Sequence, residues 1–174
     1  MMAHITSEYH KIETLYERDE HTHRLKQPLV LKNRVYGIVN PWVFTEKIDG
    51  TNIRCIWRDG KMTFGGRTNN AQIHADLVKW LYEHITPDLL RTAFPTQDTA
   101  HQVVIYGEGY GAGIQKGGGD YSLEKRFIIF DVTVSGQDGR LWWLSDENVR
   151  GVGARLGLDV VPLIGELTLA EATE

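Results

Sequence analysis

The chain has 174 residues, a hydrophobic fraction of 41% and a formal net charge of −4, which fits one globular domain, or one with a small appendage. The acidic balance gives no electrostatic sign of non-specific nucleic-acid binding, and the single cysteine excludes an internal disulfide and a cysteine-rich zinc site. No apolar run approaches the ~20 residues that span a bilayer, and the polar N-terminus does not resemble a signal peptide, so we expect a cytoplasmic protein without a membrane partner.

The N-terminal third of the chain carries few strong structural signals. Residues 1–26 are polar and charged and are expected to be loosely ordered. The histidine pair at 21 and 23 could bind a metal, but no further ligand group lies near in sequence, so a solvated loop is the simpler interpretation. The stretch PLVLKNRVYGIV, residues 28–39, predicts one or two short strands.

The clearest local signal is a hairpin over residues 52–67. Two strand-like runs flank Asp59-Gly60, a dipeptide typical of a type I′ turn. A two-residue turn fixes the register, so Arg58 opposite Lys61 would place Asn52 opposite Arg67. Opposed residues point to the same face of a sheet. A bulge at Gly65-Gly66 would shift this pairing by one residue, but Arg67 would still lie near the loop that precedes Asn52.

The remaining elements alternate between helix and strand patterns. Apolar residues at four-residue spacing predict an amphipathic helix over 71–85, ended by Pro87. Further elements are expected as strands over 102–109, 126–134 and 140–144, a short helix from Ser145 to Gly157, and a strand over 158–164. Because hairpins dominate, the pattern predicts an α+β fold built on antiparallel sheet.

The C-terminal residues form an unfinished pattern. Thr168 and Glu171 have the spacing of a capping box, which starts a helix, yet the chain ends at Glu174. A helix of one turn is not stable alone. We therefore expect a domain that is incomplete at its C-terminus; a frayed natural tail is the alternative.

The stretch TEKIDGTN, residues 45–52, places Lys47 among poor strand formers. Lys47 is either a solvated loop charge or a reactive amine. An amine becomes nucleophilic when neighbouring cations or desolvation favour loss of its proton. Lys47, Asn52 and Arg67 brought together would repel one another unless an anion lay between them, and a phosphate would serve. Three solvated loop residues remain the alternative.

Four motifs follow one another over residues 42–134: EKIDGTN, GGRTNN, YGEGYGAGIQKGGGDY and RFIIFDV. Together they resemble the covalent nucleotidyltransferase superfamily of ATP-dependent ligases and messenger-RNA capping enzymes. The Thr51-Asn52 extension and the GIQK sequence look most like the RNA ligase 2 family. The resemblance implies that residues 1–174 form an antiparallel-sheet-rich, ATP-grasp-like adenylyltransferase domain with flanking helices.

The same resemblance implies a chemistry that uses ATP and Mg²⁺ or Mn²⁺. Lys47 would take AMP from ATP as a phosphoramidate, AMP would pass to an RNA 5′-phosphate, and a 3′-hydroxyl would displace it to seal a nicked or broken strand. The implied site residues have separate roles. Arg67 and Asn52 would hold phosphate and ribose, Glu108 a ribose hydroxyl or a metal-bound water, and Phe130 the adenine, with Glu46 and Ile48 also at the nucleotide and Asp131 as a second metal ligand.

Several residues fit both a functional and a structural interpretation. Glu108 ends an apolar strand where a carboxylate gains nothing structurally, and Asp131 interrupts another at a cost unless it is paired. Phe127 and Phe130 should face opposite sides of their strand, which leaves Phe127 for the core. The glycine-rich stretch with Lys116 could wrap a phosphate through its N–H groups or act as a flexible connection.

The sequence also departs from the family. No Glu-Gly strand and no Lys-x-Lys motif follow, and Lys125 is the last lysine. Without those cations, the charge that develops on the α-phosphate is poorly neutralised, so this polypeptide should adenylylate itself weakly or not at all. Two alternatives remain, namely a catalytically silent nucleotide- or RNA-binding module and a DNA ligase or capping-type enzyme.

Overall fold

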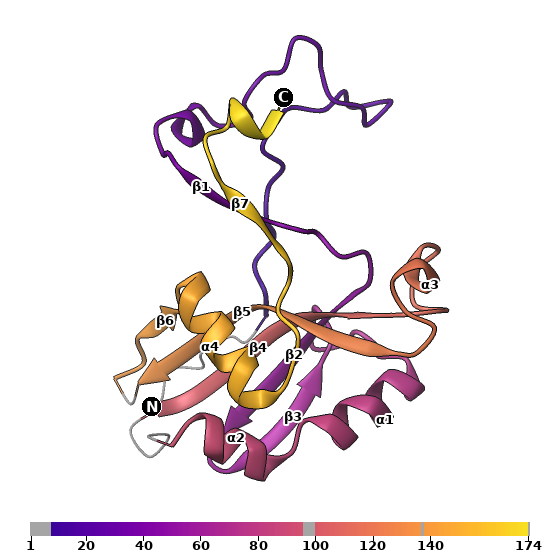
Figure 1. The fold of residues 1–174 in the computed structure, drawn as a ribbon, viewed down its shortest axis with the longest axis vertical. Helices are drawn as coiled ribbons and strands as arrows, with labels where there is room; N and C mark the ends of the chain where they lie inside the picture. The colour runs from indigo at the N-terminus through magenta and orange to yellow at the C-terminus, as the bar shows by residue number, and fades with distance from the viewer. Residues whose placement is uncertain (1–7, 96–99, 137, 174) are drawn as a thin grey trace. The chain divides into compact units, whose positions relative to one another are not determined.

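The computed structural model of the chain describes residues 8–95, 100–136 and 138–173. These residues form two compact units (Figure 1). The large unit comprises the N-terminal residues up to Tyr9 together with Lys47–Val161, and the small unit comprises His10–Glu46 together with Pro162–Glu174.

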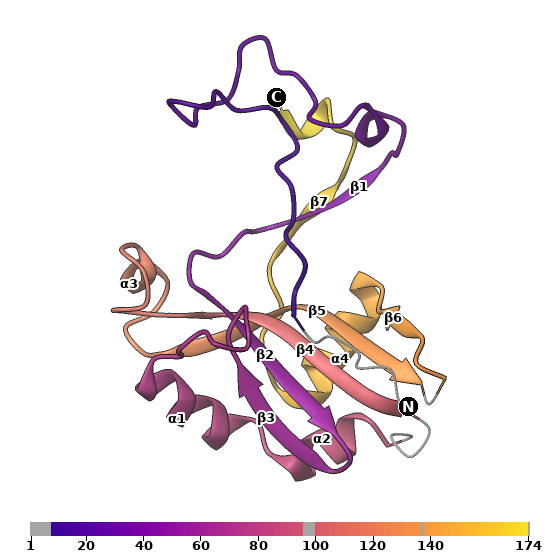
Figure 2. The same cartoon turned by 180° about the vertical axis from the view of Figure 1, so that it is seen from behind.

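The large unit is built on a five-stranded antiparallel sheet with the order β3-β2-β4-β5-β6. Seen from behind (Figure 2), β3, β2 and β4 lie side by side in that order. The strands are β2 (Thr51–Arg58), β3 (Lys61–Gly65), β4 (Ala100–Tyr110), β5 (Arg126–Gly136) and β6 (Leu141–Trp143). The predicted α+β fold with antiparallel strands is confirmed.

Three helices cover one face of this sheet. They are α1 (Ala75–His84), α2 (Pro87–Ala93) and α4 (Asp146–Leu156), while the short α3 (Gly118–Tyr121) lies in the glycine-rich stretch. Buried apolar side chains of these three helices pack against alternate residues of β2, β4 and β5 to form the main core. Burial of this face leaves the opposite face of the sheet to carry polar groups, because neighbouring residues of a strand point to opposite sides.

The predicted hairpin is confirmed. Arg58 pairs with Lys61, and the turn residues Asp59 and Gly60 have φ angles of 50° and 72°, as a type I′ turn requires. The ladder between β2 and β3 ends at Arg54 opposite Gly65.

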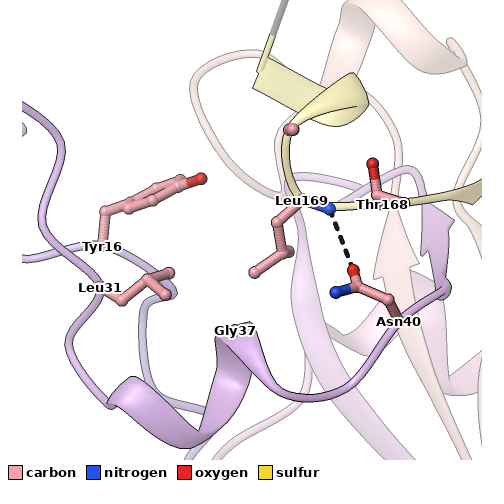
Figure 3. Close-up of a pocket in the computed structure, with 7 residues that line it drawn as sticks. Tyr16, Leu31, Gly37, Asn40, Thr168 and Leu169 are labelled. Atoms are coloured by element: carbon pink, nitrogen blue, oxygen red, sulfur yellow. Dashed lines mark hydrogen bonds between the residues drawn. The ribbon is translucent and has the colours of Figure 1, made fainter.

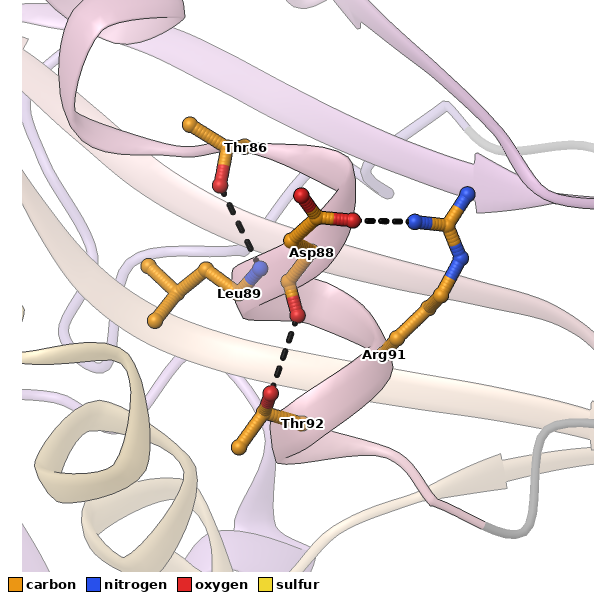
Figure 4. Close-up of polar contacts among 5 residues, drawn as sticks. All are labelled: Thr86, Asp88, Leu89, Arg91 and Thr92. Carbon is orange, nitrogen blue, oxygen red and sulfur yellow. Dashed lines mark hydrogen bonds and ion pairs between the residues drawn. The ribbon is translucent and has the colours of Figure 1, made fainter.

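Helix α2 was not predicted, because Pro87 was interpreted only as the end of the preceding helix. Proline is favoured at the first position of a helix, where its missing N–H has no partner to lose. The Leu89 N–H donates to Thr86 Oγ1 at 3.2 Å, and the Thr92 hydroxyl donates to Asp88 O at 3.0 Å. Arg91 forms an ion pair with Asp88 (Figure 4). The Thr-Pro start was therefore a helix signal.

The small unit pairs β1 (Trp42–Thr45) with β7 (Leu163–Leu167) and contains two 3₁₀ turns, η1 (Arg34–Gly37) and η3 (Glu171–Thr173). The strands predicted over 28–39 are wrong apart from an isolated bridge between Leu31 and Tyr16. Asn33 accepts a hydrogen bond from the Val35 N–H at 3.0 Å, and this local bond favours a turn over a ladder.

Two predictions at the end of the chain have different outcomes. The capping box is confirmed, since the Thr168 N–H donates to Glu171 and the Glu171 N–H donates to Thr168 Oγ1. The strand predicted over 158–164 is displaced: β7 begins only at Leu163, directly after Pro162, which has no N–H to donate. The helix from Ser145 to Gly157 is confirmed as α4, and Gly157 closes it with a φ of 64°.

The small unit also contains a pocket of about 240 Å³ (Figure 3). The Leu169 N–H donates to Asn40 Oδ1 at 3.4 Å beside it. The lining residues are Tyr16, Leu31, Gly37, Asn40, Thr168, Leu169 and Ala170. None of these residues is Asp, Glu, Lys, Arg or His, so the lining holds no charged side chain. No helix among the described residues has the length and apolar character needed to cross a membrane.

Candidate functional site

The loop between β1 and β2 carries Lys47 and is anchored by its neighbour. Ile48 is 7% exposed and packs with Tyr110, Ile128 and Val161, whereas Lys47 itself is exposed. The buried isoleucine fixes the backbone on one side while the amine stays accessible on the other. Contact between Ile48 and a nucleotide remains a prediction.

Gly50 brings this loop into close contact with β4. A Cβ at Gly50 would lie 2.3 Å from the Gly109 carbonyl oxygen and 2.9 Å from Glu108 Cγ, so only glycine fits without moving the backbone. The Gly50 N–H donates to the Glu108 carboxylate, and its carbonyl accepts from Gln115 Nε2 at 3.1 Å. The lysine loop, β4 and the glycine-rich stretch therefore meet at Gly50.

Glu108 is a half-buried carboxyl group at the centre of this meeting point. Burial raises the pKa of Glu108 to about 7, and the charge of Asp49 adds to the effect, while the Lys47 ammonium and the Gly50 N–H oppose it. Lys47 therefore lies close enough to Glu108 to act on its charge. A carboxyl group with this pKa changes protonation state near neutral pH, as groups at functional sites often do.

Asn52 lies beside Glu108, as its cross-strand neighbour in the β2–β4 ladder. The Asn52 Oδ1 atom is buried and accepts no hydrogen bond from any residue that the structure describes. An unsatisfied buried acceptor costs about 1–3 kcal/mol. A donor group from a ligand, such as a ribose hydroxyl, would relieve this cost.

The pairing predicted between Asn52 and Arg67 is not formed, because the β2–β3 ladder ends two residues earlier, at Arg54 opposite Gly65. Arg67 instead lies in the bend after β3 and is exposed. Arg54 was not among the residues predicted from the sequence. It is 1% exposed and holds this bend through a hydrogen bond to the Gly66 carbonyl oxygen. An arginine within an otherwise apolar strand pattern was the available signal.

Phe130 and Asp131 lie at an irregularity of β5. Asp131 pairs with Tyr106 and Ile129 pairs with Gly107, so Phe130 is an extra residue between them. Phe127 is buried in the main core, as predicted, whereas Phe130 packs against the smaller cluster around Ile48. The two phenylalanines are thus in different clusters.

Tyr9, which the sequence analysis also missed, contacts both residues of this irregularity. Its hydroxyl donates a hydrogen bond to Asp131. The centroid of its ring lies 5.0 Å from the ring centroids of Phe130 and Tyr106, and 5.7 Å from that of Trp143. Burial and the neighbouring Asp131 raise the pKa of Tyr9. No sequence pattern linked Tyr9 to a strand more than 100 residues away.

Two remaining residues considered in the sequence analysis, Glu46 and Lys116, lie outside the group around Gly50 and Glu108. Glu46 belongs to the small unit, where its N–H donates to the Pro162 carbonyl oxygen at 3.0 Å. Lys116 is exposed in the glycine-rich stretch. Within the described ranges no three His, Cys, Asp or Glu side chains are grouped as metal ligands, so the metal roles of Glu108 and Asp131 remain predictions.

Proteins of known structure share this fold. Three structures of a Naegleria gruberi RNA ligase each match 72% of this chain. A mutant with ATP and Mn has 18% sequence identity and a TM-score of 0.53, and a mutant with AMP and Mn has 17% identity and a TM-score of 0.52. The ligase with PPi has 18% identity and a TM-score of 0.52. The chain spans 36% of the length of each. The fold is that of an RNA ligase nucleotidyltransferase domain.

The sequence itself matches the RNA ligase family over residues 40–174. This chain therefore belongs to the RNA ligase family, as the four sequence motifs indicated. The matched region begins before β1 and includes the lysine loop, the whole sheet and β7.

Proposed function

We propose that this chain carries the nucleotidyl-transfer chemistry of an ATP-dependent RNA ligase, with Lys47 as the nucleophile. The Lys47 Nζ atom attacks the α-phosphorus of ATP, a nitrogen–phosphorus bond forms, and the bond to the bridging oxygen breaks to release pyrophosphate. AMP then passes to an RNA 5′-phosphate, and a 3′-hydroxyl displaces AMP to seal the strand. The expected partners are nicked or broken RNA ends, in the cytoplasm.

The observation that carries the proposal is the group formed by Lys47, Glu108 and Asn52. An exposed amine lies close to a half-buried carboxyl group, and that carboxyl group is paired across the sheet with an amide whose buried oxygen accepts no bond from the described residues. A structural surface gains nothing from this arrangement, since the carboxyl group and the amide both cost free energy there. A ribose hydroxyl would supply the donor for Asn52.

A divalent metal fits this site only together with the nucleotide. Mg²⁺ is commonly bound by one or two carboxylates and by substrate phosphates rather than by a complete protein cage. Glu108 would provide the carboxylate, and a bound cation would favour its ionised form. Such a cation neutralises the charge on the phosphates when it is bound. Arg67 would contact the phosphates and Phe130 the adenine.

The direct test is to find where AMP becomes attached. The chain is incubated with ATP labelled at the α-phosphate and with Mg²⁺ or Mn²⁺, and the modified tryptic peptide is identified by mass spectrometry. We expect slow, substoichiometric label on Lys47, because no lysine follows Lys125 in these 174 residues to assist at the α-phosphate. Lys47→Arg keeps the charge but should carry no label.

Other outcomes separate the alternatives. Label on another residue, or equal label in Lys47→Arg, would exclude Lys47 as the nucleophile. Complete labelling would overturn the prediction that this polypeptide is impaired. Tight ATP binding without any label would favour a silent nucleotide-binding module, and equal sealing of RNA-containing and all-DNA nicks would favour a DNA ligase.

A further inference from the structure

Arg54 is the only charged side chain among the described residues that is buried. It lies on β2 two residues after Asn52, and therefore on the same face of the sheet. Transferring a guanidinium group out of water is costly unless its N–H groups find good acceptors. Arg54 is not among the motif residues of the proposed chemistry, so its burial needs a separate explanation.

Two acceptors of Arg54 lie in the bend that carries Arg67. Arg54 Nε donates to the Gly66 carbonyl oxygen at 2.6 Å, and Arg54 Nη2 donates to Asn69 Oδ1 at 3.1 Å. The Asn69 N–H in turn donates to Glu8 Oε1 at 3.1 Å. Burial lowers the pKa of Arg54, and the negative charge of Glu8 opposes this shift. Glu8, Arg54 and Asn69 thus form one connected group.

Close packing holds the bend against this group. A Cβ at Gly65 would lie 2.9 Å from Arg54 Nη2, so the guanidinium lies directly over that glycine. A Cβ at Gly66 would lie 2.7 Å from the Ala71 side chain, and the Ala71 N–H donates to the Thr68 carbonyl oxygen at 3.2 Å. The backbone on both sides of Arg67 is therefore fixed, while its side chain remains exposed.

We propose that Arg54 is a positioning residue that holds the 66–69 bend so that Arg67 is presented to a phosphate of the bound nucleotide. This inference rests on the proposed function of Arg67. A long arginine side chain loses conformational freedom when it binds, and a backbone fixed in advance reduces the ordering that binding requires. Arg54 itself does not need to touch the nucleotide.

In this proposal Arg54 acts on nucleotide binding through Arg67, so a double-mutant cycle of the two residues tests it. The dissociation constant for ATP with Mg²⁺ is measured for the wild type, Arg54→Met, Arg67→Met and the double variant. Arg54→Met should weaken binding about tenfold, because the bend that carries Arg67 would then have to be ordered when the nucleotide binds. In the Arg67→Met background the same change should have little further effect. Two effects that multiply would overturn the proposal, because independent sites behave additively.

A second measurement does not depend on nucleotide. Limited trypsin digestion of the full chain reports how accessible the bond after Arg67 is, with cleavage after Arg58 in the hairpin turn as the internal reference. Arg54→Met should speed cleavage after Arg67 relative to this reference. An unchanged rate of cleavage after Arg67 would show that Arg54 does not hold the 66–69 bend. Asn69→Ala removes one contact at an exposed residue, so it should show a smaller increase and serves if Arg54→Met fails to fold.

The two measurements together separate the possible failures. Faster cleavage with unchanged ATP binding would make Arg54 structural only and overturn the positioning role. A wild-type chain that binds no ATP would refute the proposed function instead, and trypsin would still report whether Arg54 holds the bend. The proposal stands only if both the cleavage rate and the ATP affinity respond to Arg54, the latter through Arg67.

Discussion

Replacing Glu108 by glutamine should make this protein more stable at neutral pH while impairing its site. The carboxyl group of Glu108 has its pKa raised from an ordinary 4.5 to about 7, mainly by burial. In the pH range between these values, the folded chain holds a proton that the unfolded chain releases. The contribution of Glu108 to stability is therefore most favourable below pH 4.5 and becomes less favourable as the pH rises to about 7. Glutamine is neutral throughout and keeps an acceptor for the Gly50 N–H.

The expected magnitude follows from the size of this change in pKa. At 1.36 kcal/mol for each pH unit, the full change would correspond to about 3 kcal/mol, and partial solvent exposure of Glu108 reduces the expected effect to about 1–2 kcal/mol. The Glu108→Gln variant should match the wild type near pH 4.5 and exceed it by this amount at pH 8.

Urea denaturation followed by tryptophan fluorescence measures this difference at pH 4.5, 6 and 8. Glu83→Gln is the matched control, because Glu83 is an exposed carboxylate on α1, and its loss should change stability by less than about 0.5 kcal/mol at every pH. A gain in Glu108→Gln that does not grow with pH would refute the reasoning, as would a loss of stability at pH 8.

Two further predictions concern stability in the large unit. Gly50→Ala should lower the free energy of unfolding by about 1–3 kcal/mol, because its Cβ would meet the Gly109 carbonyl oxygen. Gly151→Ala, in α4, should raise it by about 0.5–1 kcal/mol, because a Cβ there would meet no atom within 4 Å apart from its chain neighbours and the backbone of its own helix. Equal effects of the two substitutions in urea denaturation would contradict the close approach at Gly50. Tyr9→Phe removes the hydrogen bond to Asp131 and keeps the ring contacts, so it should lower the free energy of unfolding by about 1.5–3 kcal/mol. Tyr9→Ala should lower it clearly more. A Tyr9→Phe variant with wild-type stability would show that the hydroxyl contributes nothing.

Local sequence determined the hairpin and most strands of the large unit. The Asp59-Gly60 turn fixed the register from Arg58 to Arg54, because two residues with positive φ allow only one tight connection between the strands. The same reasoning failed at Asn52 and Arg67, since a turn sets the register but not the length of the ladder. In the small unit, the Asn33 side chain favoured a turn where the apolar residues suggested a strand.

The candidate site, too, was predictable from the sequence only in part. The motifs identified Lys47, Asn52, Arg67, Glu108 and Phe130 as candidates, because spacing along the chain is preserved in the sequence. The sequence did not predict which residues surround each candidate in the folded protein. Burial in the folded sheet is the main reason that the pKa of Glu108 is raised. The Gly50 N–H that opposes this rise comes from a residue nearly sixty positions away, in the loop next to β2, the strand that pairs with β4.

Sequence patterns identified the candidate reactive groups and the elements that carry them, because periodicity and turn chemistry act over a few residues. Which of these groups share an environment became known from the folded structure. Tyr9 reaches Asp131, and Glu8 reaches the Asn69 N–H, across long stretches of chain that come together only when the large unit is folded. Burial and pairing are properties of that packing, so the unsatisfied oxygen of Asn52 and the buried charge of Arg54 appear only once the chain is folded.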